Sequence, residues 1–283
     1  MSFFEGLGPK SAPNRRKRYA VSPHSNVNNF TRNIVGANTH RYLKGKSLIK
    51  PVSKDEPQRA AIHRQAKELL ETVSTKDRWV GKYARFAAAR GLPRPKSEKV
   101  ARVAAYTDLY QRSRRGASRM NFAGIADSEP SVDVFAHGAP GYMALNSDAG
   151  EIVPLKGVAR FLSGLGLPLH SRLKIDACFS AAGTKYDGST EELWQHWQAG
   201  TTQERLDVQQ SFAANLHRVI MRDIGFLGST DGYLGNTSIE AQEVLSLAGG
   251  PARHMAVCMA PNDTAENRYI CLRKRDLRVR FVG

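Results

Sequence analysis

Cysteine is scarce in this chain of 283 residues: only three are present, and each lies among apolar residues. Small secreted proteins that depend on disulfides have more cysteines at regular spacing, so the composition excludes a disulfide framework and favours a reducing compartment. Long apolar runs are also missing, since no stretch reaches the roughly eighteen residues that a membrane-spanning helix needs. The first residues lack the charged-then-apolar order of a secretory signal peptide.

Metal-binding patterns are missing as well. No metal-ligand spacing with the cysteines is found for four of the histidines: His170, His196, His217 and His254. We therefore expect neither a metal nor any other cofactor. With 41% hydrophobic and 24% charged residues, the chain has the composition of a soluble globular protein that is long enough to bury a core.

Acidic residues are scarce in one part of the chain only. Residues 1–130 contain 27 Lys and Arg against 10 Asp and Glu, whereas residues 131–283 contain 15 against 16. The excess behind the net charge of +16 therefore lies entirely in the first part. A basic segment attracts phosphate groups, so an anionic partner (a polyphosphate, a nucleic acid or a lipid surface) is one interpretation, and a solvated, flexible tail is another.

Composition and periodicity divide the chain into three parts. Residues 1–57 are rich in Asn, Ser, Pro, Lys and Arg and show no sustained period, which predicts a basic, poorly ordered leader. Residues 58–130 show helical spacing of apolar side chains followed by a linker, which predicts a helical basic region. Residues 131–283 alternate strand and helix patterns, which predicts a separate domain.

The pattern from residue 131 predicts an α/β fold with a mostly parallel sheet, right-handed crossovers and antiparallel strands at the C-terminal end. The expected helices of the basic region are 60–73, 79–90 and 99–112. The expected elements of the domain are strands 132–136, 173–177 and 225–229, a hairpin of 142–145 with 151–153, helices 155–165 and 204–223, and strands 254–259, 269–273 and 278–282.

Two residues suited to nucleophilic catalysis follow two of these strands. His137 comes directly after strand 132–136, and Cys178 comes directly after strand 173–177. Because the carboxyl ends of parallel strands meet at one edge of a sheet, we expect both side chains at one site. There Cys178 would act as the nucleophile and His137 as acid and base, with the backbone amides of Gly138 and Cys178 forming an oxyanion hole. Each residue alone has an ordinary interpretation, a buried strand cysteine or a loop histidine, but their joint placement favours a catalytic pair.

Residues 132–138 (VDVFAHG) and 173–178 (LKIDAC) resemble the cysteine peptidases of the caspase-hemoglobinase fold. This superfamily includes caspases, metacaspases, legumains, gingipains and the self-cleaving protease domains of large bacterial toxins. Residues 137–141 are similar to the legumain histidine motif, residues 176–180 to the metacaspase cysteine motif, and residues 211–216 and 232–235 to toxin-type members.

The resemblance covers residues 131 to about 235 and implies a hydrolase, a thiol protease with a His137–Cys178 dyad that takes a protein or peptide substrate without a cofactor. Domains of this family have two strands before the His-Gly strand, for which residues 18–21 and 33–35 are the candidates here. A catalytically silent member of the family is the alternative.

Three further residues are candidates for substrate binding. Asp176 precedes Cys178 by two positions, so both side chains would face the same way along a strand. The resemblance to metacaspases implies cleavage after Arg or Lys, which a carboxylate at Asp176 would select; a carboxylate satisfied by backbone amides or a local Arg is the alternative. Trp194, in a polar insert at 183–203, and Tyr233 could line the same pocket or serve a structural purpose. Cys258 and Cys271 lie in apolar strand patterns and are expected in the core.

The Asn- and Ser-rich leader without a signal peptide, together with the resemblance to toxin domains, predicts a secreted bacterial effector with a role in virulence. Such a protein is made in the bacterial cytoplasm, exported without a classical signal peptide and delivered into a host or target cell. Residues 15–18 (RRKR) would suit self-cleavage if Asp176 selects basic residues. The competing hypothesis is a non-catalytic binding protein that docks through its basic N-terminal region on an anionic partner.

Overall fold

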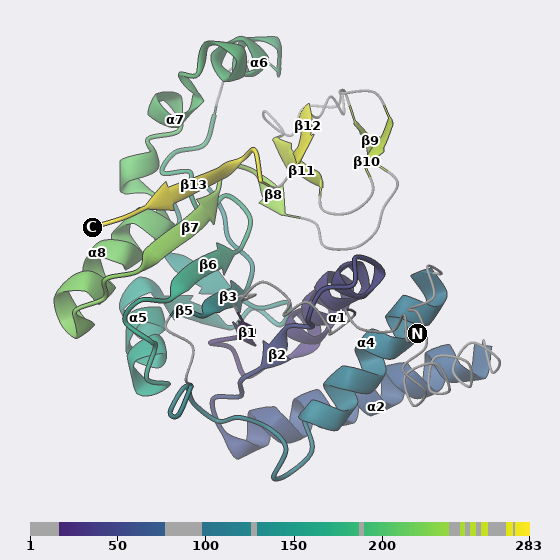
Figure 1. Ribbon diagram of the computed structural model, residues 1–283. Helices are drawn as coiled ribbons and strands as arrows, with labels where there is room; N and C mark the ends of the chain where they lie inside the picture. Colours follow the sequence, from purple (N-terminus) through teal and green to yellow (C-terminus); the bar gives the residue numbers. More distant parts are fainter. Residues whose placement is uncertain are drawn as a thin grey trace, which may run out of the picture.

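The computed structural model describes residues 17–76, 98–125, 129–186, 190–237, 244–246, 250–252, 256–259, 270–273 and 275–283 (Figure 1). Its centre is a six-stranded sheet in the order β2-β1-β3-β6-β7-β13. All neighbouring strands pair in parallel except β13, which runs antiparallel to β7 at one edge. The strands are β1 (Arg18–Val21), β2 (Lys50–Pro51), β3 (Ser131–Phe135), β6 (Arg172–Asp176), β7 (Ser229–Tyr233) and β13 (Arg278–Phe281). The α/β class and the mostly parallel sheet with antiparallel additions are confirmed.

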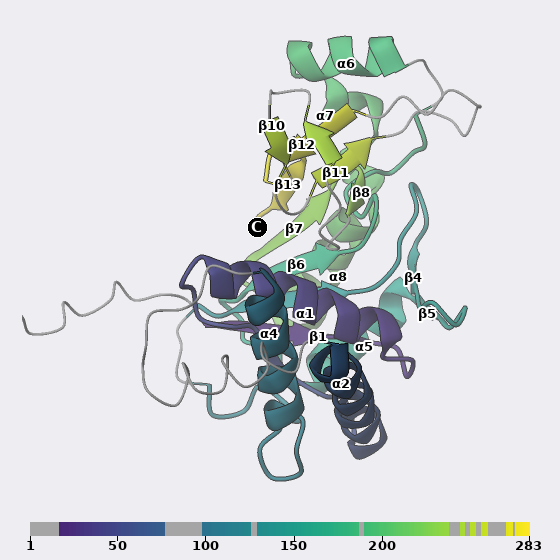
Figure 2. The same cartoon turned by 90° about the vertical axis from the view of Figure 1, so that its right-hand side faces the viewer.

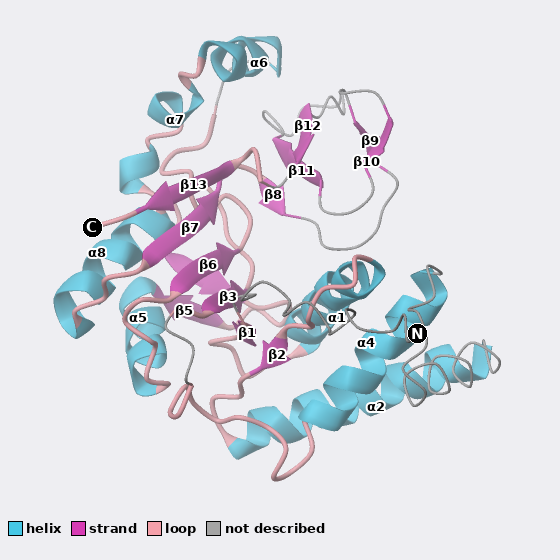
Figure 3. Cartoon of the chain, viewed as in Figure 1, coloured by secondary structure: helices cyan, strands magenta, loops and turns pink. Residues whose placement is uncertain are grey.

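Helices cover both faces of this sheet (Figure 3). On one face lie α5 (Leu155–Gly164) and α8 (Phe212–Ile224), and on the other lie α1 (Asn28–Leu43), α2 (Glu56–Lys76) and α4 (Glu98–Arg112). Figure 2 shows the second group of helices from the side, packed against one another next to β1.

Alternation along the strands explains the two cores. On β3, Val132 and Val134 pack with α5 and α8, whereas Phe135 packs with Phe30 of α1 in a second cluster. Successive strand residues point to opposite faces, so one strand contributes to both cores. Helices α5 and α8 therefore bury one face of the sheet, whereas α1, α2 and α4 bury the other face at β1 and β3.

The N-terminal part of the chain differs from the prediction. A poorly ordered leader over residues 1–57 is wrong for residues 17–57, because β1 pairs with β3 in the middle of the sheet and α1 packs on it. Of the two candidate strands in this part, residues 18–21 form a strand, whereas residues 33–35 are helical within α1. Residues 1–16 lie outside the described part.

Buried polar side chains account for this error. Asn38 in α1 is 1% exposed, and its amide donates to the carbonyl of Ile49 at 3.0 Å while it accepts from the Ile49 amide at 2.7 Å. A polar residue with satisfied hydrogen bonds can occupy a core that a hydrophobicity pattern does not reveal. The same sheet thus crosses the boundary predicted at residue 131.

Between β3 and β6 the prediction agrees with the structure. A hairpin of β4 (Ala144–Asn146) and β5 (Ile152–Pro154) leads into α5, which returns the chain to β6 beside β3. The helix expected at 155–165 is α5, and α4 corresponds to the helix expected at 99–112. The helix expected at 79–90 lies outside the described residues.

Two elements beyond β6 differ from the prediction. The long helix expected at 204–223 is broken into α7 (Thr202–Arg205), a 3₁₀ turn (Val208–Gln210) and α8, since Asp207 has a positive φ of 43°. The third strand lies at residues 229–233 instead of 225–229. At Gly228 a Cβ would lie 1.9 Å from the carbonyl oxygen of Ser171, so this residue closes a tight loop before the strand begins.

The C-terminal strands form mostly outside the main sheet. β8 (Asn236–Thr237), β11 (Ala256–Met259) and β12 (Ile270–Arg273) make a three-stranded antiparallel sheet, and β9 (Val244–Ser246) pairs with β10 (Gly250–Ala252). Cys258 and Cys271 occupy opposite register positions on β11 and β12. Their side chains lie outside the described part, so their place in a core stays a prediction.

Candidate active site

His137 lies at the carboxyl end of the sheet, after β3 and Ala136. Its amide donates to the carbonyl of Asn146 at 2.8 Å, and the Asn146 amide donates back to the carbonyl of His137 at 3.0 Å. This short antiparallel bridge ties the backbone of His137 to the last residue of β4. The imidazole itself is 46% exposed and therefore accessible to a substrate.

Cys178 lies in a tight turn that follows β6. The amide of Ser180 donates to the carbonyl of Ala177 at 3.3 Å, and Phe179 has a positive φ of 53°, as is typical of a type II turn. A left-handed backbone at a non-glycine residue is strained, so surrounding contacts have to hold it. One such contact is the amide of Phe179, which donates to the carbonyl of Gly235 at 3.0 Å. The turn presents Cys178 half-buried.

The two loops are in backbone contact. A Cβ at Gly138 would lie only 2.5 Å from the carbonyl oxygen of Cys178, so the chain can approach this closely only with glycine at that position. Three residues further on, the amide of Gly141 donates to the carbonyl of Ala182 at 3.0 Å. The loop that carries His137 therefore runs beside the loop that carries Cys178.

Two polar side chains contact the imidazole of His137. Asp148, in the turn between β4 and β5, places Oδ1 against Nε2 of the ring. Asn29, in the first turn of α1, places its amide nitrogen Nδ2 3.0 Å from the same Nε2. The side chain of His137 is thus held from two elements that are remote from each other in the sequence.

The loop after β1 packs against the β4–β5 hairpin. His24 is 1% exposed, and burial lowers its pKa. Its Nε2–H donates to the carbonyl of Leu145 at 3.0 Å, because a carbonyl oxygen can only accept. The carboxylate of Glu151 accepts from the amide of Ser25 at 2.6 Å. The N-terminal strand and its loop therefore support the hairpin that contacts His137.

The three substrate-binding candidates are placed differently. Asp176 and Tyr233 are each 4% exposed, and burial raises the pKa of Tyr233 well above its usual value, with a further contribution from the Asp176 carboxylate. The amide of Tyr233 donates to Oγ of Ser180 at 3.0 Å, which links β7 to the turn of Cys178. Trp194 belongs to α6 (Thr190–Ala199), but its side chain lies outside the described part. Their contribution to substrate binding stays a prediction.

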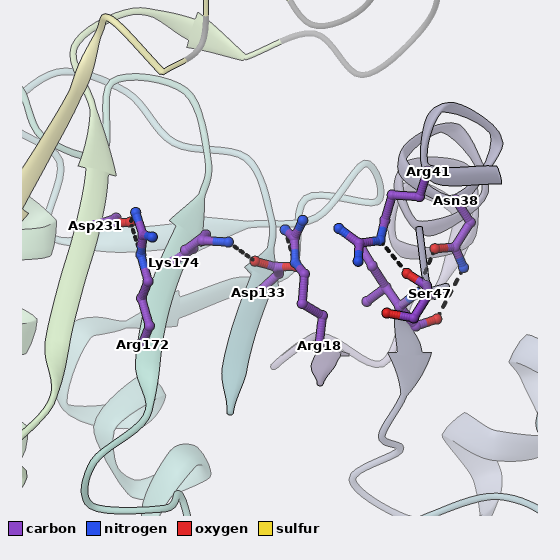
Figure 4. Close-up of polar contacts among 9 residues, drawn as sticks. Arg18, Asn38, Arg41, Ser47, Asp133, Arg172, Lys174 and Asp231 are labelled. Atoms are coloured by element: carbon purple, nitrogen blue, oxygen red, sulfur yellow. Dashed lines mark hydrogen bonds and ion pairs between the residues drawn. The ribbon is translucent and has the colours of Figure 1, made fainter. Parts of the chain in front are cut away.

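One face of the sheet carries a row of charged side chains (Figure 4). Two carboxylates, Asp133 on β3 and Asp231 on β7, are fully buried. Arg18 donates to Asp133 from Nη2 at 2.6 Å, and Lys174 lies 3.4 Å from the other oxygen of that carboxylate. We call the following residues the charged row: Arg18, Asp133, Arg172, Lys174, Asp231, Arg278 and Arg280.

Cations outnumber carboxylates in the charged row, and the pKa of Lys174 is lowered in these surroundings. Burial lowers its pKa from 10.5 to about 8; Asp133 opposes this change, whereas Arg18 and Arg172 add to it. Asp231 is shared among Arg172 at 2.6 Å, Arg280 at 2.9 Å and Arg278 at 3.7 Å. Asp176 lies at the end of β6, the strand that also carries Lys174.

Sequence reasoning missed Asn29 and Asp148. The hairpin predicted from residues 142–145 and 151–153 makes Asp148 a turn residue, and Asp is common in turns for reasons unrelated to catalysis. Asn29 is 108 residues from His137 and lies in the segment interpreted as poorly ordered. The only available signal was the acidic residue in a hairpin that directly follows the His-Gly motif.

Comparison with protein-family models, with curated proteins and with solved structures gives no match. Among the described residues, no group of three or more His, Cys, Asp or Glu side chains could hold a metal ion. No described helix is both long enough and apolar enough to cross a membrane.

Proposed function

We propose that the chain is a cysteine endopeptidase whose catalytic dyad is His137 and Cys178. The observation that carries this proposal is the backbone contact between Gly138 and Cys178, which joins the two loops at the carboxyl ends of β3 and β6. A base and a thiol on adjoining loops at this edge of a parallel sheet match the requirements of nucleophilic catalysis.

The proposed reaction has two steps. In the first, His137 accepts the thiol proton and the sulfur of Cys178 bonds to the peptide carbonyl carbon, while the amides of Gly138 and Cys178 hold the oxyanion. The carbon–nitrogen bond then breaks, and the amine leaves with the proton from His137. In the second step, His137 takes a proton from water as the water oxygen bonds to the acyl carbon. The carbon–sulfur bond then breaks, the acyl group leaves as a carboxylic acid, and His137 returns the proton to the sulfur.

The resemblance to the caspase-hemoglobinase fold supports this proposal through the sheet. Two strands, β1 and β2, precede the His-Gly strand β3 in the chain and extend the sheet beyond it, as the resemblance implies. The edge strand β13 supplies the antiparallel addition.

Cleavage after Arg or Lys, selected by Asp176, is part of the proposal. Asp176 lies two residues before the nucleophile but is nearly buried, so it would act at the base of a pocket. We expect arginyl and lysyl fluorogenic peptides to be cleaved faster than aspartyl ones, and Asp176→Asn to reduce that preference. Equal cleavage of all three peptides would show that Asp176 does not select the substrate residue.

Self-processing is a further part of the proposal, now with fewer candidate positions. Arg18 begins β1, and its side chain is bonded to the buried Asp133. Cleavage after Arg18 would therefore cut into the central sheet. Any processing in the basic run would have to occur before it, at Arg15, Arg16 or Lys17.

Thiol reactivity tests the function without a known substrate. We expect iodoacetamide near pH 7 to modify Cys178 faster than Cys258 and Cys271, because a neighbouring imidazole favours the thiolate. Peptide mapping by mass spectrometry gives the rate at each thiol, and His137→Gln should slow modification of Cys178 alone. Slow modification of all three thiols at the same rate would contradict the peptidase proposal.

A catalytically silent protein that docks through its basic N-terminal region on an anionic partner is the second candidate. Only Arg18 of the charged row lies in that region, but the row could add to the same contact, since five cations surround two carboxylates and Arg280 remains 44% exposed. If this candidate is correct, Arg278→Glu with Arg280→Glu should abolish binding of a polyphosphate, measured by titration calorimetry, while Cys178→Ala leaves it unchanged. If the double variant binds polyphosphate as tightly as the wild type, the charged row does not contact the anionic partner.

The setting proposed for the peptidase is that of a bacterial effector delivered into another cell, on the strength of the resemblance to toxin domains alone. Its protein substrate would then belong to the target cell. Detection of the tagged full chain inside co-cultured target cells would test this setting, and its retention in the producing bacteria would contradict it.

A further inference from the structure

Asp148 is fixed relative to His137 by the fold of the hairpin. The bridge between His137 and Asn146 ends two residues before Asp148, so the turn that carries the carboxylate starts at the backbone of the histidine. Glu151 at the other end of the turn accepts from the amide of Ser25 at 2.6 Å, which anchors the turn to the loop after β1. Both ends of the turn are therefore anchored, and no flexible loop has to become ordered for the carboxylate of Asp148 to contact the ring of His137.

The two partners of Nε2 make incompatible demands on it. A carboxylate can only accept, so Asp148 requires a proton on Nε2 of His137. The Asn29 amide nitrogen, 3.0 Å from the same atom, is a donor and would require Nε2 to be without a proton. Oδ1 of Asn29 accepts from Nδ2 of Asn33 at 2.5 Å, so the Asn29 oxygen can face the ring only if both amides rotate, whereas no rotation changes the carboxylate. Charge-assisted hydrogen bonds are also roughly twice as strong as neutral ones, so Asp148 decides the tautomer.

A proton on Nε2 leaves Nδ1 as the basic nitrogen of the neutral ring. We propose that Asp148 is a positioning residue that holds His137 in the Nε2–H tautomer, so that Nδ1 is the atom that removes the proton from Cys178. This inference rests on the proposed peptidase function. Without Asp148, Asn29 donates to Nε2, the ring proton moves to Nδ1, and the base is lost.

Other titratable groups surround this contact and have to stay constant in a test. His24 is buried on the loop after β1, Glu151 caps that loop, and Lys54 donates to the carbonyl of Pro23 at 3.3 Å. None of them bonds to the imidazole of His137 among the contacts described here, and variants at Asp148 leave all three in place. Because Asp148 is 36% exposed, its replacement should not unfold the chain.

Nitrogen-15 NMR reads the tautomer directly. Long-range proton–nitrogen spectra of the histidine-labelled full chain distinguish protonated from unprotonated ring nitrogens, and His137→Gln identifies the signals of His137. We expect Nε2–H in the wild type, Nδ1–H in Asp148→Ala, and a mixture in the double variant Asp148→Ala with Asn29→Ala. Asp223→Asn, which removes a carboxylate on α8 that is 46% exposed against 36% for Asp148, is the matched control and should leave the spectrum unchanged.

The rate of Cys178 alkylation supplies the second readout. At pH 7 we expect Asp148→Ala to slow alkylation of Cys178 at least about tenfold, which is less than the roughly hundredfold or more for loss of an acid–base group itself, and Asn29→Ala to change it less than about threefold. Asp148→Asn can still accept a hydrogen bond but carries no charge. Its alkylation rate should lie between those of Asp148→Ala and Asn29→Ala, and the pH dependence of that rate should shift.

Failure of this inference can be told apart from failure of the peptidase proposal. Wild-type His137 as Nδ1–H, or an Asp148→Ala variant with unchanged tautomer and alkylation rate, would overturn the role of Asp148 alone. If alkylation of Cys178 does not depend on His137 at all, the peptidase proposal fails, whichever tautomer the ring adopts.

Discussion

Lys174 offers a quantitative test of the charged row. Burial lowers the pKa of its ammonium group more than the attraction of Asp133 raises it. A pKa of about 8 in the folded chain against 10.5 in the unfolded chain corresponds to about 3 kcal/mol, at about 1.4 kcal/mol for each factor of ten in proton affinity. Its side chain is only 13% exposed, so water screens this term little. The substitution that removes this contribution is Lys174→Met, which keeps most of the length of the side chain and loses the charge.

The sign of the effect follows from proton binding. Between pH 8 and 10.5 the unfolded chain binds the Lys174 proton and the folded chain does not, so the free energy of unfolding rises with pH in this window. Below about pH 8 both states bind the proton and this contribution is flat. Relative to Lys174→Met, the wild type should therefore gain up to about 3 kcal/mol as the pH rises from 8 to 10.5.

Urea denaturation at a series of pH values measures this difference. The matched control is Lys156→Met, which removes an exposed lysine on α5 and should parallel the wild type at every pH. If wild type and Lys174→Met show the same dependence on pH between 8 and 10.5, the reasoning about the buried cation is refuted.

Two further predictions concern the contact between the loops. Gly138→Ala would place a methyl group 2.5 Å from the carbonyl oxygen of Cys178. We expect this variant to slow alkylation of Cys178 and to lower the free energy of unfolding by about 1–3 kcal/mol. The control is Gly164→Ala, which should do neither, because nothing lies within 4 Å of the added methyl group. Phe179 has a positive φ of 53°, so Phe179→Gly should be about 1 kcal/mol more stable to urea than Phe179→Ala, although both lose the same ring. Equal stability of the two variants would show that the turn is not strained.

The position of the candidate site could be predicted from the sequence because it depends on short-range features. Two apolar strands, each followed at once by a reactive residue, are joined by one hairpin and one helix. A right-handed crossover of this length leaves few places for the second strand except beside the first. β3 and β6 are indeed neighbours in parallel register.

The N-terminal half of the sheet could not be predicted in the same way. β1 begins with Arg18, whose charge is matched by Asp133 from a strand 115 residues away, and α1 buries Asn38 against Ile49. Such polar residues are stable in a core only through partners that local periodicity does not show. The contacts of His137 with Asn29 and Asp148 escape sequence reasoning for the same reason.

Digestion of a diverse peptide library by the full chain tests the central claim most directly. Mass spectrometry of the products should show new cleavage sites with the wild type, predominantly after Arg or Lys, and none with Cys178→Ala or His137→Gln. Cleavage that persists in Cys178→Ala, or an intact library with the wild type, would contradict the account.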